Sequence, residues 1–264
     1  MDRSAEIEGL AEYVAQEHWE DDRVDPVDIA KSCGMTFSFG HYANCFDGYL
    51  ECRQRRFHIY IDLDSNGSAN APRARFSFAH ELGHYFLDWH RCALEQGVPP
   101  HGSRADFVSP VTVEREADSF AANLLLPRSR IRQAAAKTID AKEVRRLANL
   151  FGTSLSATAI RCARLSLAPL IVMRWRAGRR AWCWSSQGYE GRTGNRGLWE
   201  LEQIPGGSPT REALSRGVDI QPRGTTLATW FPRIRAGSFQ DDVLIEECLS
   251  LGQYGALTLL RPDW

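Results

Sequence analysis

Three of the chain's seven histidines lie within residues 76–90, FSFAHELGHYFLDWH, and two of them accompany a glutamate. Residues 80–84, HELGH, have the pattern H-E-x-x-H. On a helix, four residues turn about 400° and rise about 6 Å, so His80 and His84 project from one face at a separation that one small cation can bridge. Zinc accepts imidazole nitrogens, so this spacing predicts a metal site.

Glu81 lies about 100° round the helix from His80, so we expect its carboxylate to reach a metal-bound water rather than the metal itself. Zinc lowers the pKa of such a water from about 15.7 toward about 7. An adjacent carboxylate can then take the proton as the hydroxide attacks a carbonyl carbon. The expected chemistry is peptide hydrolysis without a covalent intermediate, with Glu81 as the catalytic base.

A third metal ligand must come from elsewhere, because a catalytic zinc usually has three protein ligands and one open position. Within residues 114–118, EREAD, Glu114 and Asp118 lie one helical turn apart and share a face. We predict that Glu114 binds the metal and that Asp118 orients a ligand histidine. Glu116 is the rival ligand and points about 200° away from Glu114, so both cannot face the metal. Periodicity alone leaves the choice open, and we favour Glu114.

Hydrophobic periodicity places these residues on helices. Apolar residues at helical spacing predict helices over residues 4–19, about 72–90 and 113–127, and a short helix that Asp25 caps and Pro26 begins. The runs MTFSF, GYLE and FHIYIDL predict three short strands between this short helix and the helix at about 72–90. Residues 91–110 contain three prolines and no sustained period, so we expect a surface loop there.

The rest of the chain divides into two parts. Residues 128–166 carry a capping-box spacing at Asp140 and Glu143 and a break at Gly152, which together predict a helix-turn-helix-like segment. Residues 167–264 hold six of the eight tryptophans and several β-like runs. We therefore expect an α+β fold with a mainly helical domain and a small sheet at 1–127, the helical segment at 128–166, and a Trp-rich mixed α+β domain at 167–264.

Composition excludes several classes of protein. The 264 residues are 43% hydrophobic, which is enough for real cores, and the formal charge of -1 gives no global preference for nucleic acid or acidic membranes. The seven cysteines are scattered and never form a Cys-x-x-Cys pair, which is typical of free thiols in a reducing cytosol. No apolar run of about 18 residues occurs. We expect a cytoplasmic protein without a membrane partner.

Less specific features have ordinary interpretations. His90 and His101 are candidates for polarising a substrate carbonyl or protonating a leaving amine, but we favour exposed histidines without such a role. The C-terminal tryptophans are expected in a core and at its rim. Residues 128–164 contain nine Lys or Arg and two acids, a local charge of +7 that would suit DNA phosphates, an acidic partner or a solvated face. We do not favour DNA.

The chain resembles the ImmA/IrrE family of zinc endopeptidases. The resemblance rests on HELGH with the preceding Phe78 and Ala79, and on residues 114–127, EREADSFAANLLLP, which follow the pattern E-x-x-A-[DN]-x-F-A-x-x-L-L-x-P. It covers about residues 5–165. The C-terminal part is similar to the extra domain of longer members, which is GAF-like in radiation-response relatives. Asp118 stands where many members have asparagine.

The resemblance implies His80, His84 and Glu114 as zinc ligands, with manganese as a substitute, and Glu81 as the base. It also implies a function. Family members cleave helix-turn-helix transcriptional repressors and so release stress, mobile-element or prophage genes. We expect a regulated, site-specific endopeptidase with such a repressor as substrate, and a C-terminal domain that senses a signal or docks the substrate. The alternatives are a DNA-binding regulator with a structural zinc and an inactive peptidase-like protein that only binds a repressor.

Overall fold

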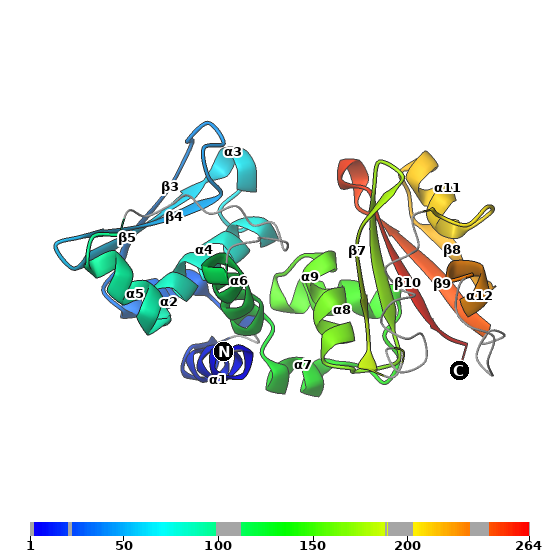
Figure 1. The fold of residues 1–264 in the computed structure, drawn as a ribbon, viewed down its shortest axis with the longest axis horizontal. Helices are drawn as coiled ribbons and strands as arrows, with labels where there is room; N and C mark the ends of the chain where they lie inside the picture. The colour runs from blue at the N-terminus through cyan, green and yellow to red at the C-terminus, as the bar shows by residue number, and fades with distance from the viewer. Residues whose placement is uncertain are drawn as a thin grey trace. The chain divides into compact units, whose positions relative to one another are not determined.

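The structure is a computed structural model that describes residues 3–20, 23–98, 112–187, 189, 203–232 and 243–263. The chain forms two compact units (Figure 1). The first comprises residues 1–133 and 148–154, and the second comprises residues 134–147 and 155–264. The three-domain division at 127 and 166 stays a prediction.

The first unit begins with the two helices that the sequence predicts. Helix α1 spans Ser4–Glu17 and buries Ile7, Ala11 and Val14, which lie on one face. Helix α2 spans Pro26–Ser32. The Asp25 side chain accepts a hydrogen bond of 3.0 Å from the backbone N–H of Val27, which satisfies one of the free donors at the start of the helix. A short ribbon of β1 (Trp19–Glu20) and β2 (Arg23–Val24) joins them.

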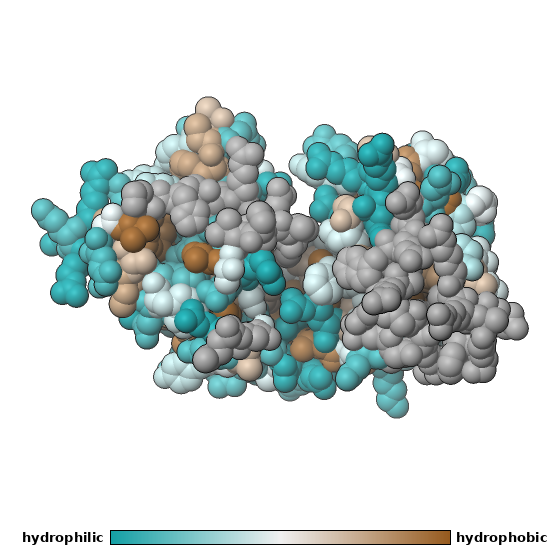
Figure 2. Space-filling model, in the orientation of Figure 1, coloured by the Kyte–Doolittle hydropathy of each residue, from teal (hydrophilic) through white to brown (hydrophobic). Residues whose placement is uncertain are grey.

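A three-stranded sheet follows, in the order β3-β5-β4. Strand β3 spans Thr36–Gly40, β4 spans Gly48–Arg53 and β5 spans Arg56–Asp62. The central strand β5 pairs parallel to β3 and antiparallel to β4, which leaves β4 at an edge. Phe57, Ile59 and Ile61 alternate toward the core, as their period of two predicts. The visible face of this unit mixes hydrophilic and hydrophobic residues (Figure 2).

Four helices complete the part of this unit that positions the candidate site. Helix α3 (Leu63–Asn66) leads to α4 (Pro72–Phe86), then α5 (Asp88–Glu95) and, beyond the undescribed residues 99–111, α6 (Thr112–Leu125). The expected loop over 91–110 is wrong for residues 91–95, which are helical. Leu87 adopts an extended conformation and separates α4 from α5, and partly buried Trp89 and Leu94 pack onto the core. A helix of two turns was too short for its periodicity to be recognised.

Helices α4 and α6 approach each other closely at Gly83. A Cβ atom on Gly83 would lie 3.1 Å from both Cα and the carbonyl oxygen of Ala117. One turn along, the rings of Phe86 and Phe120 stack with centroids 5.6 Å apart. Small residues at the crossing and aromatic residues beside it therefore set the spacing of the two helices.

Three further helices follow α6: α7 (Arg128–Ala134), α8 (Ala141–Phe151) and α9 (Leu155–Arg164). Asp140 caps α8 as predicted, because its Oδ1 accepts a hydrogen bond of 2.7 Å from the backbone N–H of Glu143. Gly152, with a φ of 63°, provides the left-handed residue between α8 and α9. Most of α9 is buried, and α9 packs against strands β6 and β7 of the second unit.

The second unit contains a five-stranded antiparallel sheet in the order β7-β6-β10-β9-β8. Its strands are β6 (Ile171–Arg176), β7 (Arg179–Ser185), β8 (Ile220–Thr226), β9 (Val243–Ser250) and β10 (Ala256–Pro262). Helices α11 (Pro209–Arg216) and α12 (Leu227–Trp230) and the short helix η1 (Gly252–Tyr254) connect them. Trp175 and Trp230 are fully buried in the core, as expected.

The predicted α+β class is confirmed. The likeness of the C-terminal part to a GAF domain stays a prediction. Within the described ranges, no helix combines the length and the apolar character that crossing a membrane requires.

Candidate metal centre

Helix α4 brings His80 and His84 together because they lie four residues apart on its buried face. Both side chains are buried, His80 to 1% and His84 to 7% relative exposure. Their Nε2 atoms lie 3.1 Å apart. The two imidazoles therefore point at one place, as the spacing of the motif predicts.

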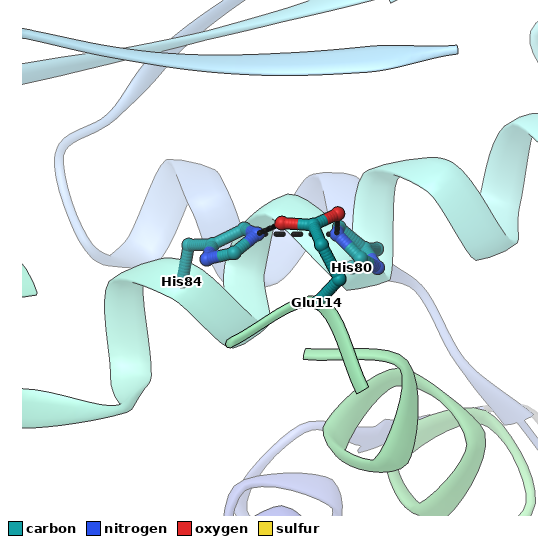
Figure 3. Close-up of side chains that lie close together, drawn as sticks. All are labelled: His80, His84 and Glu114. Carbon is teal, nitrogen blue, oxygen red and sulfur yellow. Dashed lines mark hydrogen bonds and ion pairs between the residues drawn. The ribbon is translucent and has the colours of Figure 1, made fainter. Parts of the chain in front are cut away.

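Glu114 reaches the same place from the first turn of α6. Its Oε2 lies 3.3 Å from Nε2 of His80, and its Oε1 lies 3.4 Å from Nε2 of His84. Figure 3 shows the carboxylate facing both histidines, with α4 and α6 supplying opposite sides of the group. These three buried residues form a group that can hold a metal ion.

The spacing of these donor atoms fits zinc. Ligand bonds of about 2.0–2.1 Å in tetrahedral geometry place neighbouring donors about 3.3 Å apart. The three separations in the structure are 3.1, 3.3 and 3.4 Å. Two imidazoles and one carboxylate also match the donor types of a catalytic zinc site with one open position. The structure identifies no ion, and manganese accepts the same donors.

Asp118 lies one turn after Glu114 and contacts the opposite side of the His80 ring. Its Oδ1 is 2.8 Å from Nδ1 of His80. A carboxylate oxygen at this distance accepts the proton on Nδ1 of His80, which leaves Nε2 as the nitrogen that faces Glu114 and the metal position. This is the geometry expected of the orienting residue that the sequence analysis predicts.

Glu116, the rival ligand, lies away from the group and contacts α5 instead. Its Oε2 is 3.0 Å from Nε2 of His90 and accepts a hydrogen bond of 2.8 Å from the indole N–H of Trp89. Nδ1 of His90 is in turn 3.1 Å from Nδ1 of His84. His90 is buried, so the expectation of an exposed histidine is wrong. The sequence offers one signal for this contact, which is that His90 follows His84 by only six residues. The structure shows that α5 folds back so that His90 contacts His84.

Glu81 is buried on α4 beside the edge strand β4. A Cβ atom on Gly48 would lie 2.5 Å from Oε1 of Glu81, so only glycine leaves room for this carboxylate. Glu81 is not among the three converging donors. Its position next to His80 in sequence and its different direction on the helix agree with a base rather than a ligand.

The protons of the site are strongly coupled. Burial lowers the pKa of His80, but hydrogen bonds to Asp118 and Glu114 outweigh burial and raise it to about 10. Burial raises the pKa of Glu114, but hydrogen bonds to both histidines outweigh it and hold the pKa well below its usual range. The chain therefore gathers a negative carboxylate and a retained proton at one buried point, and a divalent cation would displace that proton.

Tyr85, next to His84 in the sequence, packs edge-on against Phe57 with ring centroids 5.1 Å apart, which indicates a packing role. His101 lies outside the described residues.

One family model matches the segment that holds the candidate metal centre. The model is that of peptidase M78, described as the IrrE N-terminal-like domain, and the matched segment includes His80, Glu81, His84, Glu114 and Asp118. Residues 63–163 match the IrrE N-terminal-like domain. The predicted resemblance to the ImmA/IrrE family is confirmed over this segment, which is of the metallopeptidase type.

A solved structure shares the fold over nearly the whole chain. It is a Mycobacterium tuberculosis transcriptional regulator with a TM-score of 0.58 and 12% sequence identity, and the match covers 98% of this chain and 76% of that one. No curated protein matches the sequence. Beyond the IrrE N-terminal-like segment, the similarity is therefore one of fold.

Proposed function

We propose that this chain is a zinc-dependent endopeptidase that makes regulated, site-specific cuts in a protein substrate, a helix-turn-helix transcriptional repressor. The observation that carries the proposal is the convergence of His80, His84 and Glu114, with Glu81 beside them, inside the segment that matches the IrrE N-terminal-like domain. The transcriptional regulator that shares the fold supports a regulatory setting.

Each residue has a defined task in this proposal. His80, His84 and Glu114 hold the ion, and Asp118 keeps the His80 ring in place. Bound zinc would polarise the scissile carbonyl and acidify a water molecule. Glu81 would take the proton of the attacking water and pass it to the leaving amine nitrogen.

The proposal places the protein in the cytoplasm, where a repressor is found. All seven cysteines are free in the structure, which agrees with a reducing compartment.

Two features of the basic segment weigh against the DNA-binding alternative. Burial of most of α9 leaves little of this helix to enter a groove. Several arginines in the segment are also paired with acids, namely Arg128 with Glu8, Arg145 with Asp219, and Arg146 with Glu143. Of these acids, Glu8 and Asp219 lie outside residues 128–164 and offset part of the local charge of +7, whereas Glu143 is already counted in it.

The deciding experiment compares the native protein with Glu81→Gln. Each is mixed with zinc and with the helix-turn-helix repressor encoded beside its gene, and new termini are sought by mass spectrometry. We expect one new terminus with the native protein and none with Glu81→Gln, while both bind zinc equally. Retained biological output in Glu81→Gln would favour the inactive partner, and salt-dependent duplex binding without cleavage would favour the DNA-binding regulator.

Selectivity is tested separately with unfolded casein. We expect slow or no degradation, because the proposal is a single regulated cut. Rapid unselective degradation would contradict it.

A further inference from the structure

A neutral histidine carries one proton, on one of its two ring nitrogens. For His84 to bind a metal through Nε2, that proton must lie on Nδ1. The Nδ1 atom of His84 lies 3.1 Å from Nδ1 of His90. Of two nitrogens at this distance, one must donate and the other must accept. The tautomer of His90 therefore determines which nitrogen of His84 carries the proton and which nitrogen presents a lone pair to a metal.

Glu116 determines the tautomer of His90. Its Oε2 lies 3.0 Å from Nε2 of His90 and also accepts the indole N–H of Trp89 at 2.8 Å. The guanidinium of Arg3 lies over the Trp89 ring, 4.2 Å from its centroid, with Nη1 3.9 Å from Oε1 of Glu116. With these donor and cationic groups around it, Glu116 acts as the acceptor and places the proton of His90 on Nε2.

The contact with Glu116 places the proton of His90 on Nε2, so Nδ1 of His90 presents a lone pair to Nδ1 of His84. His84 then donates from Nδ1 and presents the lone pair of Nε2 to the metal.

The structure assigns His90 and Glu116 a positioning role: they fix the tautomer and orientation of His84, as Asp118 does directly for His80. The two ligand histidines are thus supported differently, one by a carboxylate and the other by a histidine that a carboxylate polarises. This inference rests on the proposed binding of zinc by His80, His84 and Glu114. It adds residues from α5 that H-E-x-x-H spacing does not identify.

The test measures zinc affinity of the full-length protein by competition with a chromophoric chelator. His90→Leu removes the acceptor, and we expect it to weaken zinc binding about 10–100-fold, as loss of an outer hydrogen-bond partner typically does. His90→Asn places a carbonyl oxygen near the position of Nδ1, and we expect it to recover most of the affinity. His58→Leu is the matched control, because His58 also has both ring nitrogens in contact, with Thr36 and Ser38, but lies on strand β5 and is not part of the ligand group.

The outcomes separate this inference from the proposed function. If the native protein binds no zinc, both fail. If it binds zinc and His90→Leu binds equally well, or His90→Asn is as weak as His90→Leu, the positioning role is overturned while the metal site stands. Where His90→Leu does not fold, ring ¹⁵N spectra of the zinc-loaded native protein decide: we expect the proton of His90 on Nε2, and a proton on its Nδ1 would overturn the inference.

Discussion

Gly48 on the edge strand β4 faces the carboxylate of Glu81 so closely that a Cβ atom would lie 2.5 Å from Oε1. The atom that must yield to such a methyl group is the tip of a flexible side chain rather than backbone. An added methyl group would therefore displace the proposed base and leave the fold intact.

Gly48→Ala is expected to lower the rate of cleavage about 10²-fold, because displacement of a catalytic group by about 1 Å costs this much. Zinc affinity and melting temperature should be retained, since Gly48 has no left-handed backbone and the atoms nearest to its Cβ position belong to Glu81. The measurements are single-turnover cleavage, chelator competition and thermal unfolding. Gly224→Ala on β8 is the control, because a Cβ there meets nothing within 4 Å. Full activity in Gly48→Ala would contradict the placement of Glu81.

The choice between two carboxylates on α6 can be tested by a matched pair of variants. Glu114→Gln removes the negative charge that faces both histidines, and we expect zinc affinity to fall by more than about 100-fold, the upper end of what outer partners cost. In Glu116→Gln the amide oxygen can still accept from His90 and Trp89, so the loss should stay below about tenfold. Chelator competition measures both. Equal losses would show that the ligand assignment is wrong.

Asp118 needs to accept a hydrogen bond rather than to carry a charge. Asp118→Asn keeps an oxygen that can accept from Nδ1 of His80 at a comparable distance, whereas Asp118→Ala does not. We expect Asp118→Ala to weaken zinc binding about 10–100-fold and Asp118→Asn to weaken it much less. If Asp118→Asn weakened zinc binding as much as Asp118→Ala, the negative charge of Asp118 would be the feature that matters.

Zinc affinity should rise with pH across an unusually wide range. The pKa of His80 is raised to about 10, so below that pH the ion must expel a proton to bind Nε2. Each unit of rising pH then makes expulsion easier, and the apparent affinity should increase about tenfold per unit until the pH approaches 10. Chelator competition between pH 6 and pH 10 measures this. A plateau just above pH 6.5, the ordinary value for histidine, would contradict the coupling of His80 with Asp118 and Glu114.

Sequence reasoning found the parts of the site that depend on local geometry. His80 and His84 converge because four residues make about one helical turn, and Glu114 and Asp118 share a face of α6 for the same reason. Likewise, alternation at Phe57, Ile59 and Ile61 identified the inward face of β5. Each of these patterns extends over enough residues for its period to be recognised.

Contacts that depend on how separate elements pack were not visible in the sequence. The fold of α5 back toward α4 puts His90 against His84, and the approach of β4 to α4 puts Gly48 against Glu81. Neither pair has a characteristic spacing. The choice between Glu114 and Glu116 also required packing, because it depends on which side of α6 faces α4 and which faces α5.

Because Gly83 has no side chain, Ala117 of α6 packs directly on the backbone of α4. This close packing keeps Glu114 of α6 near His80 and His84 of α4. Larger residues at this crossing would push the helices apart before they disrupted either helix. Such a chain would remain folded and would still contain every residue of the HELGH motif, yet its imidazoles and its carboxylate would be too distant to share an ion. A search for active relatives should therefore require small residues at both positions, in addition to the motif itself.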